Sequence, residues 1–226
     1  MTNETEKVGD AIDWAGLKET SRETGYLQPG FKALILAASH AVKGWPSETH
    51  VEMSRALESG VHPDTAWAAA SLILSSRGFG PADLMAAALL KKGEHPPAPN
   101  PSPSTLTVDE ALVQLMSDGD LPEWAAPLAK YAPKALARYL TIRNNAWNQN
   151  ALSEREVHLI LTAVNAADGK PPLAARHAQF AAKAGATPGE IIEAAAITIE
   201  VGGVTAWFES SVALGEVVKG LETSAG

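Results

Sequence analysis

The sequence predicts an all-α protein, built as a tandem repeat of antiparallel helical units. Of its 226 residues, 46% are apolar and only 6% are aromatic. Much of the apolar share is Ala, which favours helix and allows close helix packing. No stretch alternates with period two for long, as a half-buried strand would. In addition, Leu34-Ile35-Leu36 returns 125 residues later as Leu159-Ile160-Leu161.

Matched Gly and Pro residues are the strongest evidence for this repeat, because Ala and Leu are common throughout the chain. The matched pairs are Gly60 with Gly185, Pro63 with Pro188, and Gly78 with Gly203. Such residues mark helix ends and starts, so the same helical plan is interpreted as occurring twice. We expect a first, diverged repeat with an N-terminal extension over residues 1–92, a Pro-rich linker over 93–105, and a second repeat over 106–226.

Helix start and stop signals divide the first repeat into short helices. They predict helices over residues 31–43, 47–59, 63–77 and 82–91. Residues 1–30 are expected to form one or two short polar helices, with Trp14 and Leu17 as anchors. The segment from Gly93 to Ser104 holds five prolines and no large apolar residue, which is typical of an extended spacer.

The second repeat carries clearer helix starts than the first. Ser153 with Glu156, and Thr187 with Glu190, have the spacing of capping boxes, in which the side chains and backbone of the first turn bond reciprocally. Pro188 stands at the first helical position behind Thr187. These signals and the apolar spacing predict the helices of the second half. They cover residues 107–117, 134–147, 154–168, 172–184, 188–201 and 205–219.

Charge and composition narrow the possible functions and locations. The formal net charge is −8 and the pI is near 5.2, which argues against nucleic acid or an anionic membrane as the main partner. No apolar run reaches about 18 residues, the length expected of a membrane-spanning helix. The polar, acidic N-terminus differs from a signal peptide, so a cytoplasmic location is expected. Because the chain has no cysteine, thiolate metal sites and thiol redox chemistry are excluded.

His158 and His177 are the main candidate catalytic residues. They lie eleven residues before and eight residues after Gly169, where an antiparallel helix pair would turn. The offsets differ by three residues, roughly 4.5 Å of helical rise, so the two imidazoles are expected to face each other. Histidine pKa values move readily into the range of proton transfer. Two purely structural histidines are the alternative, since the spacing by itself does not distinguish the two cases.

Other polar residues have simpler interpretations. Glu52 occupies the position of His177 in the first repeat, either as a second polar centre or on a solvated helix face. Glu200 and Glu209 flank a possible pocket mouth but are expected to be exposed. Three further histidines are interpreted as structural: His40 as a helix residue, His62 as a helix-cap residue and His95 as a linker residue. Two histidines with a carboxylate could bind zinc or iron, but no helical His–His or His–Glu spacing supports a metal site.

The run from Leu152 to Trp207 resembles the carboxymuconolactone decarboxylase and alkylhydroperoxidase-D-like superfamily. It shows a Leu-Ser-x-Arg-Glu helix start, an apolar helix ending in a Gly turn, and His177 eight residues before Gly185. A Thr-x-x-Glu start and a Gly-Gly break follow. The resemblance covers about a quarter of the chain directly and implies the all-α fold.

The resemblance also implies where the functional residues lie. His177 falls on the functional histidine of the family, and His158 falls on the position of its acidic partner. The peroxidase branch has two cysteines where this chain has Lys170 and Leu173, so thiol peroxidase activity cannot carry over. The decarboxylase branch, which uses acid–base chemistry without a cofactor, fits better. The rings that family members form imply a homo-oligomer, with a trimer favoured.

Together these observations predict a cofactor-free lyase or isomerase that acts on a small carboxylated lactone or enolisable acid. His177 is the expected general acid and base, and His158 the residue that orients it or carries the second proton. Lys170 and Arg176 are candidates for binding a substrate carboxylate, and Trp207 for lining the pocket. Two alternatives stay open: a non-catalytic oligomeric scaffold of the same fold, and a His-ligated metalloenzyme.

Overall fold

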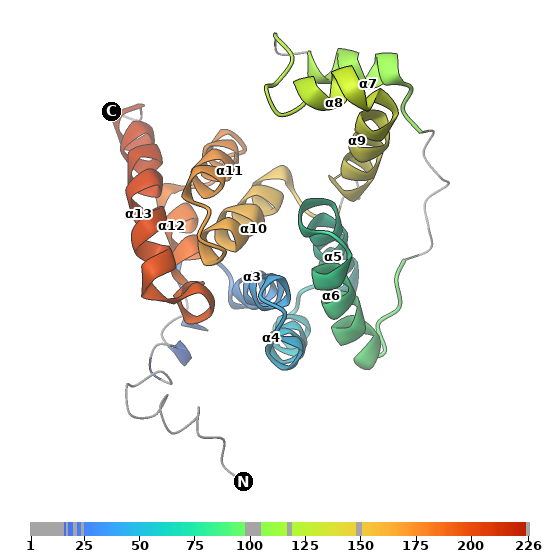
Figure 1. Ribbon diagram of the computed structural model, residues 1–226. Helices are drawn as coiled ribbons and strands as arrows, with labels where there is room; N and C mark the ends of the chain where they lie inside the picture. The colour runs from blue at the N-terminus through green and yellow to red at the C-terminus, as the bar shows by residue number, and fades with distance from the viewer. Residues whose placement is uncertain are drawn as a thin grey trace.

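The computed structural model describes residues 16, 18–19, 22–23, 25–97, 105–116, 119–147 and 151–224. All regular secondary structure in these residues is helical (Figure 1), so the predicted all-α class is confirmed. Trp14 and Leu17, the expected N-terminal anchors, and most of the prolines of the linker lie outside the described residues.

The first helical unit consists of four helices in chain order. They are α3 (Pro29–Val42), α4 (Pro46–Glu58), α5 (Pro63–Arg77) and α6 (Phe79–Lys91). The predicted boundaries agree to within one or two residues except at α6, which begins three residues early. Pro81 is tolerated there because the first turn of a helix has N–H groups without intrahelical partners.

The second unit repeats this plan with α10 (Glu154–Ala167), α11 (Pro171–Lys183), α12 (Pro188–Ala196) and α13 (Ile199–Ser224). The bounds of α10 and α11 are those of α3 and α4 shifted by 125 residues. The glycines that follow have matching positive φ angles: Gly44 at 76° and Gly169 at 64°, Gly60 at 91° and Gly185 at 92°, Gly78 at 84° and Gly203 at 76°. These matches support the interpretation as a tandem repeat.

The two units differ where α12 ends. The counterpart α5 continues to Arg77, and a helix over 188–201 was predicted, but α12 ends at Ala196. Both the amide and the hydroxyl of Thr198 donate to the Ala195 carbonyl, the hydroxyl at 2.7 Å, which tightens the turn and competes with the helical pattern. The next helix, α13, then begins before the predicted break and bends at Gly203.

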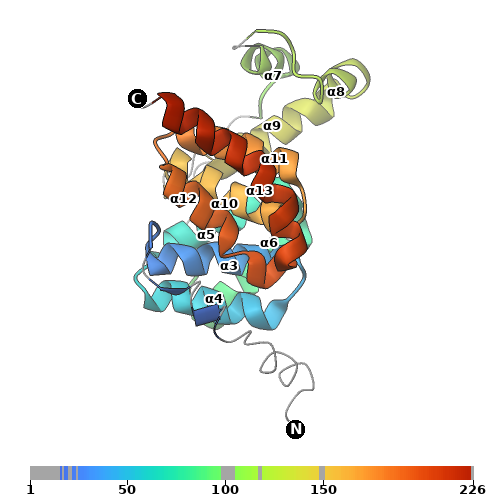
Figure 2. The same cartoon turned by 90° about the vertical axis from the view of Figure 1, so that its left-hand side faces the viewer.

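Three helices lie between the units in the sequence: α7 (Val108–Leu115), α8 (Ala126–Tyr131) and α9 (Pro133–Trp147). In Figure 2, α7 and α8 lie at the top and α9 runs from them toward the other helices. We call residues 105–116 and 119–147 the cap. Its own small core consists of Ala111, Ala125, Leu136, Ala137 and Leu140. The sequence predicted α7 and α9 but not α8, a six-residue helix. The cap packs on the first unit, because its helix α9 contacts helix α5 of that unit.

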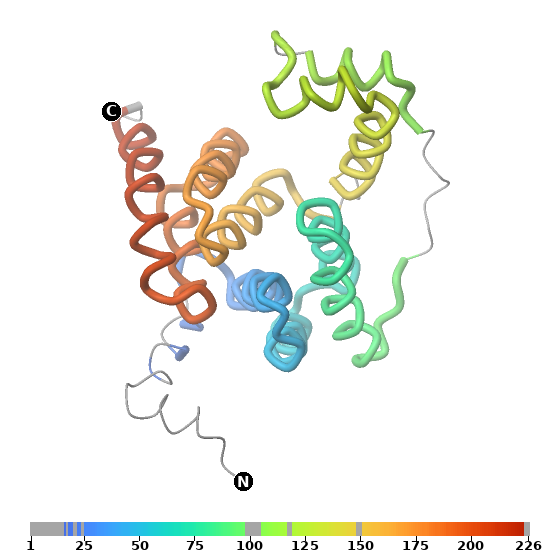
Figure 3. The backbone as a smooth tube through the Cα atoms, in the orientation of Figure 1, coloured from blue at the N-terminus to red at the C-terminus, as the bar shows by residue number. Residues whose placement is uncertain are grey.

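The two units share one hydrophobic core, in which α3 and α10 pack against each other (Figure 3). Both copies of the Leu-Ile-Leu motif lie in this core and are buried. The repeated motif therefore supplies the contact between the units, and the chain folds around it as one body.

Among the described residues, no single helix has the length and apolar content needed to cross a membrane. The pair Pro188–Ala196 and Ile199–Thr223 passes the same test of length and composition only when taken together, across a bend of 117°.

Candidate functional site

The structure brings His158 of α10 and His177 of α11 together. Their Nδ1 atoms lie 3.1 Å apart, and the rings stack with centroids 5.4 Å apart and planes inclined by 29°. The turn at Gly169 sets the two helices in the register that the offsets predicted. The juxtaposition expected from the sequence is therefore present.

Aromatic side chains enclose this pair. His158 is only 3% exposed. The ring of Trp147 meets it edge-on at 5.4 Å between centroids, and the ring of Phe180 stacks on it at 5.1 Å. Half-buried His177 borders an open pocket. Both imidazoles line this pocket, and His177 is the more exposed of the two.

Burial and nearby cations keep both imidazoles neutral. Burial, with repulsion from Arg143, lowers the pKa of His158 to about 4. Burial, followed by repulsion from His158 and from Arg176, Arg77 and Arg143, lowers the pKa of His177 to about 3. At neutral pH one Nδ1–H therefore donates to the other Nδ1. The ring that donates has an unprotonated Nε2, which is a proton acceptor.

The pocket beside the histidines has a volume of about 570 Å³, within the range of small-molecule sites. Both units and the cap contribute to its wall. Three arginines line it, Arg77 from α5, Arg143 from α9 and Arg176 from α11, against a single carboxylate, Glu154. Because the Glu154 side chain is 75% exposed, water screens it, and the pocket favours an anion.

Arg77 shows that the first unit takes part in this site. Its Nη2 donates to Asn165 Oδ1 at 2.5 Å, and Asn165 Nδ2 in turn donates to the Leu161 carbonyl at 2.6 Å. The first unit therefore contributes a side chain to the wall of this pocket. A sequence signal existed: the position of Arg77 corresponds to Gly202 in the second copy, so the first copy places a long cation where the second has none.

Arg143 was also missed by the sequence analysis. Its guanidinium lies over the Trp147 ring, 4.2 Å from the centroid, a favourable cation–π geometry. Burial lowers the pKa of Arg143, although the group stays protonated. Nothing in the local sequence distinguishes it, because its place beside the histidines depends on how α9 packs on α5 of the first unit.

Of the predicted substrate-binding residues, only Arg176 lines the pocket. Lys170 precedes α11 and pairs with Asp168 at 2.6 Å, because that carboxylate lies two residues away. Trp207 is half-buried and packs against the shared core. Lys170 and Trp207 therefore lie outside this pocket.

The first unit contains a buried polar cluster at the matching position. Glu52, His40 and Glu200 are 2%, 3% and 5% exposed, so the expectation of exposed glutamates holds for Glu209 but is wrong for Glu200. The Glu52 carboxylate accepts a hydrogen bond from Arg22 at 2.8 Å and forms an ion pair with Arg55 at 2.7 Å. Burial nevertheless raises the pKa of Glu52 overall.

This cluster also crosses between the units. His40 Nε2 lies 3.6 Å from Glu200 Oε1. Arg77 of α5 contacts Asn165 of the second unit, and Glu200 at the start of α13 lies close to His40 of the first unit. None of these three residues lines the pocket beside His177.

No cluster of three or more histidine, aspartate or glutamate residues fit to hold a metal ion occurs in the part of the chain that the structure describes. The three arginines around the histidine pair also disfavour a bound cation by repulsion.

The fold and site together define an all-α, cysteine-free helical protein with a neutral histidine pair beside a basic pocket. Residues 133–215 match the model of the Carboxymuconolactone decarboxylase family. The matched segment is similar to that family, spans α9 to most of α13 and contains both histidines. Arg77 and the helices α7 and α8 lie outside the matched segment. No curated protein matches the chain.

Proposed function

We propose that this protein is a cofactor-free enzyme, a lyase or isomerase, that moves a proton on a small enolisable carboxylic acid or carboxylated lactone. The observation that carries the proposal is the neutral His158–His177 pair at the side of a basic pocket. The family match supports a carboxy-lyase among the possible reactions. Because the chain has no cysteine, a thiol cannot carry the proton, and we assign this role to the imidazoles.

The arginines supply the binding energy for the acid. Arg176, Arg143 and Arg77 surround the pocket with three permanent positive charges. A guanidinium can bind a carboxylate through two parallel hydrogen bonds, which fixes its orientation as well as its position. The substrate carboxylate is thereby held beside His177, and the neighbouring carbon is presented to the imidazole.

The proposed reaction uses the tautomer in which His177 Nδ1–H donates to His158 Nδ1 and His177 Nε2 is unprotonated. In isomerisation, His177 Nε2 takes a proton from the carbon next to a carbonyl, the C–H electron pair becomes the enolate, and the imidazolium returns the proton to another carbon. In decarboxylation, the C–C bond electrons form the enolate as carbon dioxide leaves, and protonated His177 delivers the proton to carbon. His158 accepts or donates through the Nδ1 contact as His177 changes charge.

Substrate binding also adjusts the basicity of the pair. In the free enzyme, arginine charges help to keep both histidine pKa values low. A bound carboxylate neutralises part of that charge, so the pKa of His177 rises toward the working pH. The histidine can then hold the proton that the reaction needs.

Replacing His177 tests the proposal. A panel of lactones, β-keto acids and other enolisable acids is screened by two readouts, carbon dioxide release and exchange of the α-hydrogen with deuterated solvent. On the substrate found, His177→Gln should lower kcat/KM at least about a hundredfold, the usual weight of a general acid–base group. His158→Gln should show a smaller loss with a shifted pH profile.

His95→Gln is the matched control, because His95 is exposed and lies outside the helices and the pocket. It should keep the wild-type rate. A wild-type rate in folded His177→Gln would contradict the proposal and favour a binding or scaffold protein. A stoichiometric metal in the purified protein, measured by elemental analysis, would favour the metalloenzyme instead.

A further inference from the structure

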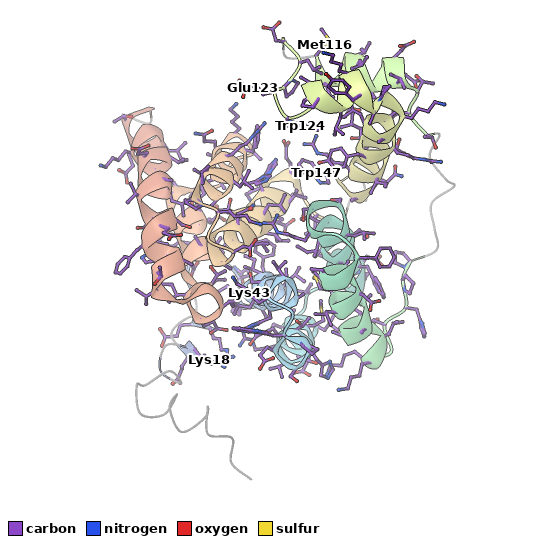
Figure 4. All side chains as sticks on the ribbon, in the orientation of Figure 1. Lys18, Lys43, Met116, Glu123, Trp124 and Trp147 are labelled. Carbon is purple, nitrogen blue, oxygen red and sulfur yellow. The ribbon has the colours of Figure 1, made fainter. Side chains whose placement is uncertain are left out.

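Two large aromatic side chains in the pocket wall are partly exposed. Trp124 of the cap is 40% exposed and Tyr139 of α9 is 39% exposed, and both line the pocket. Their rings pair edge-to-face, with centroids 5.8 Å apart and planes at 80°. Figure 4 marks Trp124 in the cap and Trp147 in α9. An exposed aromatic pair inside a pocket is a surface for an apolar group.

The other aromatic rings of the pocket are already in use. The Trp147 ring carries Arg143 over one face and directs its edge to His158. Phe180 stacks on His158 and has Arg176 and Lys183 nearby, at 5.8 and 5.7 Å from its centroid. Trp124 and Tyr139 are therefore the aromatic surfaces open to a ligand.

Helix α9 sets the order of these groups along the pocket. Tyr139, Arg143 and Trp147 follow at intervals of four residues and so share one helix face, with about 6 Å of rise between neighbours. Tyr139 lies at the Trp124 end, Trp147 lies at the His158 end, and Arg143 lies between them. The pocket thus runs from an aromatic wall, past a cation, to the histidine pair.

We propose that the cap selects acids in which a short chain joins the carboxylate to an aromatic ring, so that the substrate is an aryl-substituted enolisable acid. The ring packs on Trp124 and Tyr139, the carboxylate pairs with Arg143 and Arg176, and the carbon between them faces His177. This inference rests on the proposed function for its reaction, but the recognition of the ring is a separate property. Trp124 lies outside the family match, so the selectivity belongs to the cap of this chain.

Binding of inert acids to the full-length protein tests the inference without any turnover. 3-Phenylpropanoate, 3-cyclohexylpropanoate and butanoate are titrated at fixed ionic strength by calorimetry and tryptophan fluorescence. 3-Phenylpropanoate should bind about tenfold more tightly than butanoate, with the cyclohexyl acid between them, because aromatic pairing adds to the gain from apolar burial. In Trp124→Leu the preference for the phenyl acid should fall about five- to tenfold, while butanoate binding changes less than twofold.

Trp45→Leu is the matched control, since Trp45 is also 40% exposed but lies outside the pocket. It should leave the binding of all three acids unchanged, and thermal melting checks that both variants are folded. Equal affinity for phenyl and aliphatic acids, no binding of the phenyl acid, or unchanged selectivity in folded Trp124→Leu would overturn the inference. His177→Gln should keep its affinity for 3-phenylpropanoate. Failure of the catalytic proposal and failure of ring recognition are therefore distinguishable.

Discussion

A single contact, 3.1 Å between Nδ1 atoms, gives His158 and His177 their chemical character. Two imidazolium ions could not share it, because like charges at that distance repel strongly. Burial and three arginines act in the same direction. The pair is therefore a neutral donor and acceptor.

The low pKa values predict how the protein responds to acid. Both folded values, about 4 for His158 and about 3 for His177, lie below the unfolded value of about 6.5. The unfolded chain therefore binds more protons as pH falls below about 6.5. The stability associated with the neutral pair is complete above that pH and is lost as pH falls toward the folded values.

Two measurements check this prediction. In ¹H–¹³C NMR spectra, the ring signals of the two histidines, assigned from His158→Gln and His177→Gln, should not titrate between pH 8 and 5.5. The free energy of unfolding in urea should fall more steeply from pH 6.5 to 5 in the wild type than in the double Gln variant. Ordinary titration midpoints near 6.5 would contradict the neutral pair.

Among the individual residues of the candidate site, the sequence predicted some and missed others. His158, His177 and Arg176 follow from motif and spacing, since they lie on one helical hairpin. Arg77, Arg143 and Trp124 come from other elements, and their place in the pocket depends on packing between units. Lys170 and Trp207 were assigned by proximity along the chain, which does not determine on which side of a helix a residue lies.

Among the elements, capping boxes were the most reliable sequence signal. The boxes at Ser153 with Glu156 and at Thr187 with Glu190 are both complete in the structure, because their bonds are local. The early end of α12 and the bend in α13 could not be predicted so well. They depend on Thr198 and on the close approach of α13 to α10.

Gly202 permits that close approach. A Cβ at this position would lie 2.6 Å from the Ala167 carbonyl oxygen and 3.0 Å from its Cα, which are backbone atoms of α10 that cannot turn aside. Gly202→Ala should therefore destabilise the protein by about 1–3 kcal/mol, the usual range for overpacking. Urea unfolding at pH 7 is the measurement.

Gly215 provides a control on the same helix. A Cβ there meets nothing within 4 Å, so Gly215→Ala should be neutral or stabilising by up to about 1 kcal/mol through helix propensity. Equal effects of the two substitutions would show that α13 does not need a glycine beside α10.

For the whole molecule, an ion pair across the two units complements the shared core. Lys32 of α3 is 2% exposed, pairs with Glu193 of α12, and donates to the Glu23 carbonyl at 2.6 Å. Glu193 also accepts the Leu27 amide at 2.6 Å. The cost of removing one charge from such a pair is large, because the other is left largely buried without its counter-ion.

Lys32→Met should therefore lower the free energy of unfolding by about 3–5 kcal/mol, measured in urea at pH 7. The double variant Lys32→Met with Glu193→Gln should lose less than the sum of the two single variants, because the uncompensated carboxylate is gone. Additive losses would indicate that the two side chains do not interact across the units.

The sequence by itself determined the helical class, the two candidate histidines and the register of the hairpin that joins them. Helix caps, turns and i-to-i+4 spacing are local, so they can be read from neighbours in the chain. Only the tertiary structure decided what surrounds the histidines: an arginine from the first unit, another from α9, and an aromatic wall from the cap. Those contacts arise from packing between distant segments, because the two units bury one common core and α9 rests on α5 beside it.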